Sequence, residues 1–168
     1  MSSSVSIMAI PALDPDAFEA LSLDERRAGA WETFPLRSGR LLYTFFSKAT
    51  KADLGVFGSE DIVRKGETIQ TGVIFQGDHV AGVIKQLGAL LRSKARTARS
   101  LVAHGGGVAD LARVTAALHT GTWPKGKDPA EEAAAFAHHL LKFARIAKQE
   151  RRGVCWEYRS KRGAEALP

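Results

Sequence analysis

Apolar residues recur every three or four positions through most of the second half of the chain. After Asp78 this spacing predicts a long helix that continues through residues 93–103 until the three glycines at 105–107 end it. A second helix is predicted for residues 108–119. A third begins at Asp128, with a proline in its first turn, and its apolar face runs to about residue 152. The pattern therefore predicts a helical C-terminal half.

Strands are predicted where apolar runs are short and bounded by glycine or polar residues. Thr68–Gln76 and Val154–Arg159 have this pattern, and the aromatic run Arg40–Phe46 is typical of a third, buried strand. The other N-terminal segments are expected to be short or irregular: a helix opened by residues 14–16, a connector over 31–35, a helix or loop over 48–58, and one or two helical turns over 59–65.

We expect a single domain, because neither repeats nor an evident linker interrupts the chain. Residues 1–12 are interpreted as a flexible tail, residues 13–160 as the domain and residues 161–168 as a basic tail. The mixture of strands and helices predicts the α/β class (α+β mixed), with a small sheet flanked by helices. The 168 residues are enough to bury one core without disulfides or metal ions.

The composition indicates in which cellular compartment the protein is expected, but it says little about an activity. Hydrophobic residues make up 45% of the chain and charged residues 25%, as in an ordinary globular protein. No apolar run approaches the roughly 20 residues that span a bilayer. Cys155 is the sole cysteine and cannot form an internal disulfide, which suits a reducing compartment. We therefore expect a cytoplasmic protein without membrane insertion. Cys155 is expected to be a buried packing residue of a strand.

Charge is distributed unevenly between the two halves of the chain. Residues 1–79 carry 8 Lys or Arg against 11 Asp or Glu, whereas residues 80–168 carry 16 against 7. This asymmetry attracts polyanions, so DNA or a nucleotide is the expected partner. The alternative is a solvated face that only keeps the protein soluble. The candidate cations fall in two helical stretches, which contain Arg92, Lys94, Arg96 and Arg99 in the first and Lys142, Arg145, Lys148 and Arg152 in the second.

The junction between the predicted strand 68–76 and the helix after it is a candidate phosphate site. Gly77 permits a tight turn, where the first N–H groups and the positive end of a helix point at one spot. Asp78 either caps the helix or holds Mg²⁺ with its carboxylate oxygens, and His79 donates to phosphate or moves a proton. The alternative is a capped helix start without a function.

Other candidates have simpler structural explanations. Trp123, in a loop with lysines, either stacks on a base or fills a hydrophobic gap, and the gap is favoured. His138 and His139 diverge by about 100° on a helix and cannot chelate one metal together. A divalent ion could be held by four carboxylates whose irregular spacing is more typical of surface charges: Glu60, Asp61, Glu67 and Asp78.

Residues 75–87, FQGDHVAGVIKQL, resemble the signature of the ParB/sulfiredoxin fold, in which a strand ends at a turn and a helix begins. The positions in step with the sulfiredoxin form, FGGCHRxAAxxQL, are Phe75, Gly77, His79, Ala81 or Gly82, Gln86 and Leu87. The resemblance implies a turn that binds the phosphates of ATP or CTP. Asp78 replaces the catalytic cysteine, which rules out sulfinic-acid reduction. Val80 replaces a phosphate-binding arginine, for which Lys85 or the cluster Arg92–Arg99 is the obvious substitute.

Within that fold, the size and the basic, alanine-rich C-terminal half are similar to the plasmid fertility-inhibition proteins of the Osa/FiwA kind. That resemblance implies a plasmid-encoded inhibitor of DNA transfer through a type IV secretion system, with a secretion or coupling protein as a further partner. It also implies binding of ATP, Mg²⁺ and DNA and an ATPase or DNase activity, with Asp78 and His79 as catalytic residues. Two alternatives stay open: a non-enzymatic ParB-like DNA-binding or partition protein, and a protein-interaction inhibitor whose basic face binds an acidic secretion component.

Overall fold

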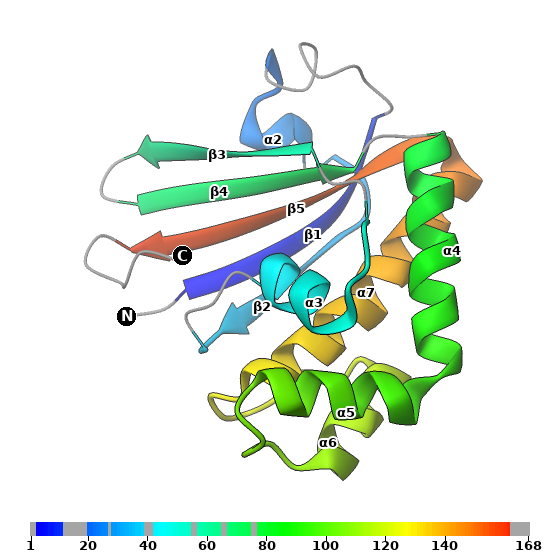
Figure 1. The fold of residues 1–168 in the computed structure, drawn as a ribbon. Helices are drawn as coiled ribbons and strands as arrows, with labels where there is room; N and C mark the ends of the chain where they lie inside the picture. Colours follow the sequence, from blue (N-terminus) through cyan, green and yellow to red (C-terminus); the bar gives the residue numbers. More distant parts are fainter. Residues whose placement is uncertain are drawn as a thin grey trace.

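Five strands form one antiparallel sheet in the computed structural model, in the order β2-β1-β5-β4-β3 (Figure 1). The structure describes residues 3–11, 20–26, 28–38, 42–54, 57–64, 67–74 and 77–161. The strands are β1 (Ser3–Pro11), β2 (Trp31–Leu36), β3 (Phe57–Arg64), β4 (Glu67–Ile74) and β5 (Arg152–Lys161). The last strand, β5, pairs with β1 on one side and with β4 on the other, so it joins the two halves of the sheet.

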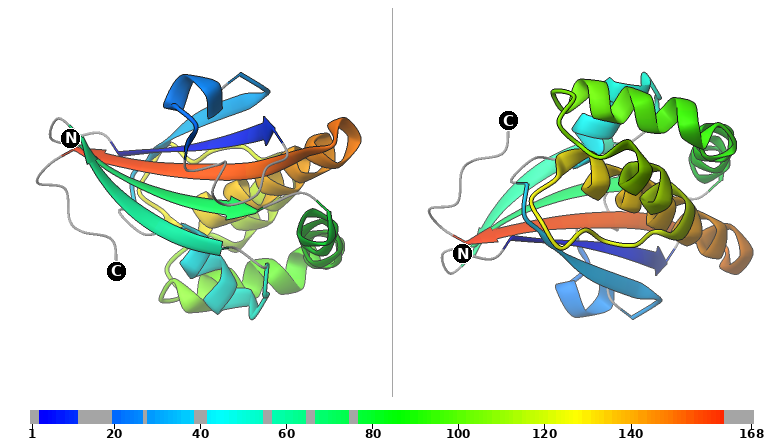
Figure 2. Two further views of the ribbon diagram at one scale, coloured as in Figure 1. Left: turned by 90° about the horizontal axis from the view of Figure 1, so that it is seen from above. Right: turned by 90° about the horizontal axis from the view of Figure 1, so that it is seen from below.

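The described residues form six helices besides the sheet, and five of these lie on one side of it. They are α2 (Leu23–Arg26), α3 (Leu42–Thr50), α4 (Asp78–Arg92), α5 (Lys94–His104), α6 (Leu111–Thr120) and α7 (Pro129–Glu150). Figure 2 shows α3 to α7 on one side of the sheet and the short α2 on the other. Among the described residues, no helix combines the length and apolarity needed to cross a bilayer.

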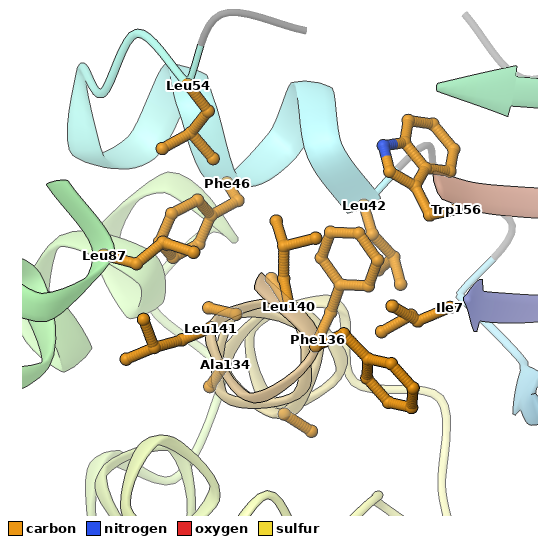
Figure 3. Packing of buried hydrophobic residues seen from close by; sticks show 14 of the residues in the cluster. Ile7, Leu42, Phe46, Leu54, Leu87, Ala134, Phe136, Leu140, Leu141 and Trp156 are labelled. Atoms are coloured by element: carbon orange, nitrogen blue, oxygen red, sulfur yellow. The ribbon is translucent and has the colours of Figure 1, made fainter. Parts of the chain in front are cut away.

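The core lies between the sheet and α7, the longest of these helices. Phe136 of α7 points toward Ile7 of β1 and Trp156 of β5, whereas Leu140 of α7 points toward α3 (Figure 3). Gly72 of β4 makes room for the indole, because a Cβ at this position would lie 2.1 Å from the Trp156 ring. The buried faces of α3, α4 and α7 thus meet over one side of the sheet.

The mixed α/β class and the helical C-terminal half are confirmed. The Asp128 carboxylate accepts hydrogen bonds from the N–H groups of Ala130 and Glu131, so the predicted cap begins α7. Strands also form at the two segments where the apolar runs predicted them, as β4 and β5. The single long helix expected after Asp78 is two helices, because the chain bends at Ser93 between α4 and α5.

The interpretation of residues 1–12 as a flexible tail is wrong for the described part, which forms β1. Val5 and Ile7 are buried beneath the helices, while Met8 and Ile10 are buried on the opposite face beside Cys155. A strand that pairs on both edges and is covered on both faces tolerates apolar residues at consecutive positions, which obscured the alternation. At the other end, the predicted basic tail begins inside β5 at residue 161, and residues 162–168 lie outside the described part.

Three further segments differ from their predictions. The run 40–46 is helical from Leu42, because Leu42, Phe45 and Phe46 occupy one helical face that is buried in the core. The helical turns expected over 59–65 belong to strand β3, and the connector over 31–35 belongs to edge strand β2. The helix expected to open at residues 14–16 would begin outside the described residues.

Candidate functional site

A groove of about 770 Å³ lies where the end of α4 meets α5, α6 and the middle of α7. Its apolar lining comes from Leu91, Leu118 and Leu141, together with Gly88. α4 runs beside the second half of α7 in the opposite direction, so the end of α4 lies opposite residues 138–145 of α7 (Figure 1). The groove is therefore a product of helix packing between segments that are some fifty residues apart in sequence.

Four cations line this groove, and no Asp or Glu does so among the described residues. Arg92 and Lys94 come from the α4–α5 junction, and Lys142 and Arg145 come from α7. The arginines and Lys142 are exposed, and Lys94 is half-buried. Cations gathered in a concave, acid-free site raise the local potential, which favours phosphate groups. The two basic stretches predicted from the sequence thus meet here through two residues from each.

Two histidines also line the groove, and the sequence pattern did not indicate either of them as part of a site. His119 lies in the last turn of α6, and His138 lies on α7 with its Nδ1 3.2 Å from the Leu118 carbonyl oxygen. His138 precedes Lys142 by four residues and Arg145 by seven, so these three side chains share one face of α7. Only the packing of α6 against α7 places His119 beside them.

A carboxylate lies just behind the α7 wall of the groove. Glu32 of β2 accepts a hydrogen bond from the Lys142 ammonium, with Nζ 2.9 Å from Oε1, and its other oxygen lies 3.3 Å from Nδ1 of His139. Nε2 of His139 is 2.8 Å from the Gly121 carbonyl oxygen, which assigns the ring proton to Nε2 in the neutral form. Burial lowers the pKa of His139 below its usual 6.5. Near neutral pH, Lys142 is therefore the cation that pairs with Glu32.

The Gly77 turn lies at the other end of α4. Gly77 has φ of 84°, no side chain caps the helix, and Asp78 and His79 are exposed. At a rise of 1.5 Å per residue, the 15-residue helix separates this turn from Arg92 by about 21 Å. Lys85 is exposed midway along α4. The turn and the groove are hence two separate places, and the first basic stretch does not face the turn.

The remaining predicted cations are scattered. Arg96 lines a hollow on the far side of the α4–α5 junction, and Arg99 is exposed on α5. Lys148 is exposed near the end of α7, the end that lies beside the start of α4 (Figure 1). Arg152 forms an ion pair with Glu150, with Nε 3.2 Å from Oε2. Four of the eight predicted polyanion contacts therefore share one site.

The backbone keeps Glu67 and Asp78, two members of the proposed carboxylate set, far apart. Glu67 begins β4 and Asp78 follows its other end, so the length of the strand, about 23 Å over seven residues at 3.3 Å each, separates them. Within the described part of the chain, no group of three His, Cys, Asp or Glu is placed to hold a metal. Asp78 brings one carboxylate to the described part of the turn, and a Mg²⁺ ion held in this way takes its other ligands from water and substrate phosphates. Binding of ATP with Mg²⁺ at this turn therefore stays a prediction.

Trp123 fills a local gap instead of presenting its ring to solvent. Its indole stacks on Phe34, with centroids 4.6 Å apart and an angle of 12° between the planes. Its Nε1 donates a hydrogen bond to the Pro35 carbonyl oxygen over 2.6 Å. Phe34 therefore occupies one face of the Trp123 ring. The rings of His138 and His139 lie edge to face with centroids 5.5 Å apart, closer than their helical spacing predicts, and their nitrogens face different carbonyl groups.

Comparison with known proteins adds no relative: no family model, curated protein or solved structure matches the chain. The resemblance of residues 75–87 to the ParB/sulfiredoxin signature therefore stays a prediction.

Proposed function

We propose that this protein binds a nucleic-acid strand through the basic groove between α4, α5 and α7. The observation that carries the proposal is the convergence of Arg92, Lys94, Lys142 and Arg145 on one concave surface without an acidic lining residue. Phosphates are the natural partners of such a surface, and their release of counterions makes binding strongly dependent on salt.

The lining favours a single strand over a duplex. The groove is also lined by two imidazoles, of the exposed His119 and the partly exposed His138, which offer flat surfaces to unpaired bases. Its three leucines are largely buried. In a duplex the bases are stacked on one another, so only the backbone would meet the groove. Proteins that bind single strands combine these two features, a positive groove and surfaces for bases.

The resemblance to fertility-inhibition proteins supports a role for this binding in plasmid biology. In that role the protein would hold a DNA strand and so block its export through a type IV secretion system. We place strand binding ahead of ATP or DNA hydrolysis, because the groove gathers four cations whereas the Gly77 turn presents a single carboxylate.

A binding assay with matched variants tests the proposal. The first variant replaces the four groove cations, Arg92, Lys94, Lys142 and Arg145, by glutamine. The control replaces four exposed cations outside the groove, Lys48, Arg113, Lys125 and Lys127, with the same loss of charge. The probe is a fluorescent single-stranded DNA of about 16 nucleotides, a length that covers a typical site.

We expect binding that weakens steeply with salt for the wild type and the control. In the groove variant the slope of log K against log salt should fall by about three, because single strands contribute about 0.7 per neutralised phosphate. Equal losses in the two variants would show that net charge, not the groove, attracts DNA. No binding by the wild type at low salt would overturn the proposal in favour of a protein partner.

A further inference from the structure

A second hollow, of about 440 Å³, lies on the opposite side of the α4–α5 junction from the groove. It is bounded by the end of α3, the last turn of α4 and the first two turns of α5. Its cations are Lys51 and Arg96, both exposed, and no Asp or Glu lines it among the described residues. Lys51 has φ of 57°, in the left-handed region, so the backbone leaves α3 abruptly at this position.

Hydroxyl groups make up most of the remaining polar lining of the hollow. Thr50 donates its hydrogen bond to the Phe46 carbonyl over 2.8 Å, and Ser100 donates to the Arg96 carbonyl over 3.2 Å. Each hydroxyl oxygen still has lone pairs with which it accepts a further hydrogen bond. The hollow therefore combines two cations for a phosphate with acceptors for the hydroxyl or amino groups of a nucleotide.

The hollow and the groove share one wall. Arg92 and Lys94 line the groove, whereas Ser93 and Arg96 line the hollow. The wall is fixed, because the buried Thr97 hydroxyl donates to the Leu90 carbonyl over 2.9 Å and so joins α5 to α4. The two sites are separated by the thickness of a helix, about 10–12 Å.

We propose that the hollow is a second phosphate subsite for the same strand, which crosses the α4–α5 junction from the groove. This inference rests on the proposed function, because it assigns a binding site to the part of that strand that extends beyond the groove. A free phosphate or mononucleotide reaches only one side of the junction. A polymer occupies both sides, and its second contact forms at a high effective concentration.

Strand length is the variable that tests the proposal. One variant carries Lys51→Gln with Arg96→Gln. Its control carries Lys48→Gln with Arg113→Gln, two exposed cations that line neither site. Probes are single-stranded DNA and RNA of about 4 and about 16 nucleotides, which bracket known site sizes. AMP and inorganic phosphate serve as probes for a site that takes free anions. Thermal melting of each variant confirms that it is folded.

The hollow variant should bind the short probes like the wild type and the long probes about tenfold more weakly, with a salt slope reduced by about 1.4 for two phosphates. Unchanged affinity for the long probes in the hollow variant, while the groove variant loses it, overturns the subsite and leaves the proposed function intact. Unchanged affinity in both variants overturns both. A third result would also overturn the proposal. If the wild type binds AMP or phosphate saturably, the hollow variant loses this binding and affinity does not depend on strand length, the hollow is a site for free anions.

Discussion

The two ends of α4 offer two different ways to attract a phosphate. At its start, the Gly77 turn exposes the first N–H groups of one helix, with the Asp78 carboxylate beside them. At its end, Arg92 joins cations from α5 and α7 in a concave site with an apolar lining. The first is a local feature that thirteen residues encode. The second exists only after distant helices have packed.

A helix terminus is therefore a weaker anion site than a surface where several helices converge. The charge at a helix terminus contributes about 0.3–1 kcal/mol to an exposed interaction, and a carboxylate in the first turn already uses part of it. In the proposed function, each groove cation instead contributes a phosphate contact of its own. The groove therefore depends on the packing of several helices, whereas the turn depends only on the start of one helix.

The largest expected effect comes from the anchor of α7, which carries one wall of the groove. The fully buried Glu132 in its first turn accepts hydrogen bonds from the Arg37 N–H over 2.8 Å and from the Ser38 hydroxyl over 2.5 Å. Glu132→Ala leaves these donors unsatisfied and should lower the free energy of unfolding by about 2–3 kcal/mol. Urea unfolding measures the loss, and the partly exposed Glu131→Ala is the control.

The same carboxyl group gives a pH dependence of defined sign. Burial raises the pKa of Glu132 above its usual 4.5, outweighing the hydrogen bonds from Ser38 and Arg37 that lower it. Its protonated form is hence favoured in the folded protein, and the stability it contributes is present below pH 4.5 and is lost as the pH rises through the folded pKa. Glu132→Gln should remove this decline. A parallel decline in the variant would assign it to another group.

Replacement of Glu32 should have a smaller effect, which is an increase in the affinity for DNA. Its carboxylate pairs with Lys142 and competes with a phosphate for that ammonium. Glu32→Gln should strengthen binding of the long DNA probe by up to about fivefold, because exposed ion pairs are worth up to about 1 kcal/mol. Glu25→Gln, a similar neutralisation of an exposed carboxylate in α2, serves as the control. Weaker binding by the Glu32 variant would mean that the carboxylate positions Lys142 instead of competing for it.

The sequence was informative where one physical requirement determined a segment. The helix cap at Asp128 and the apolar face after Asp78 each require only local chemistry, so α7 and α4 could be predicted. β1 could not, because its partner strands β2 and β5 follow it more than twenty and more than one hundred residues later in the chain. The aromatic run before Phe46 satisfies strand and helix patterns equally, and tertiary packing selected the helix.

The candidate site divides in the same way. Charge counting found Arg92, Lys94, Lys142 and Arg145, because basic residues at helical spacing are visible in one dimension. It did not separate these four from Arg99 or Arg152, nor did it find the histidines, since membership of the groove depends on the contact between α4 and α7. A groove between helices is a property of their packing angle and offset, which no single helix encodes.

The smallest expected effect is at the start of α4, and it is the sharpest test of the comparison. Asp78 lies about 21 Å from Arg92 along the helix, more than twice the screening length of about 8 Å at physiological salt. Asp78→Ala and His79→Ala should therefore keep the affinity for DNA within about twofold of the wild type. The same proteins are assayed for ATP and DNA hydrolysis with Mg²⁺. Turnover by the wild type that Asp78→Ala abolishes would restore the turn as the catalytic site that the ParB/sulfiredoxin resemblance implies. A tenfold loss of DNA affinity in either variant would place the strand at the turn, because neither side chain touches the groove.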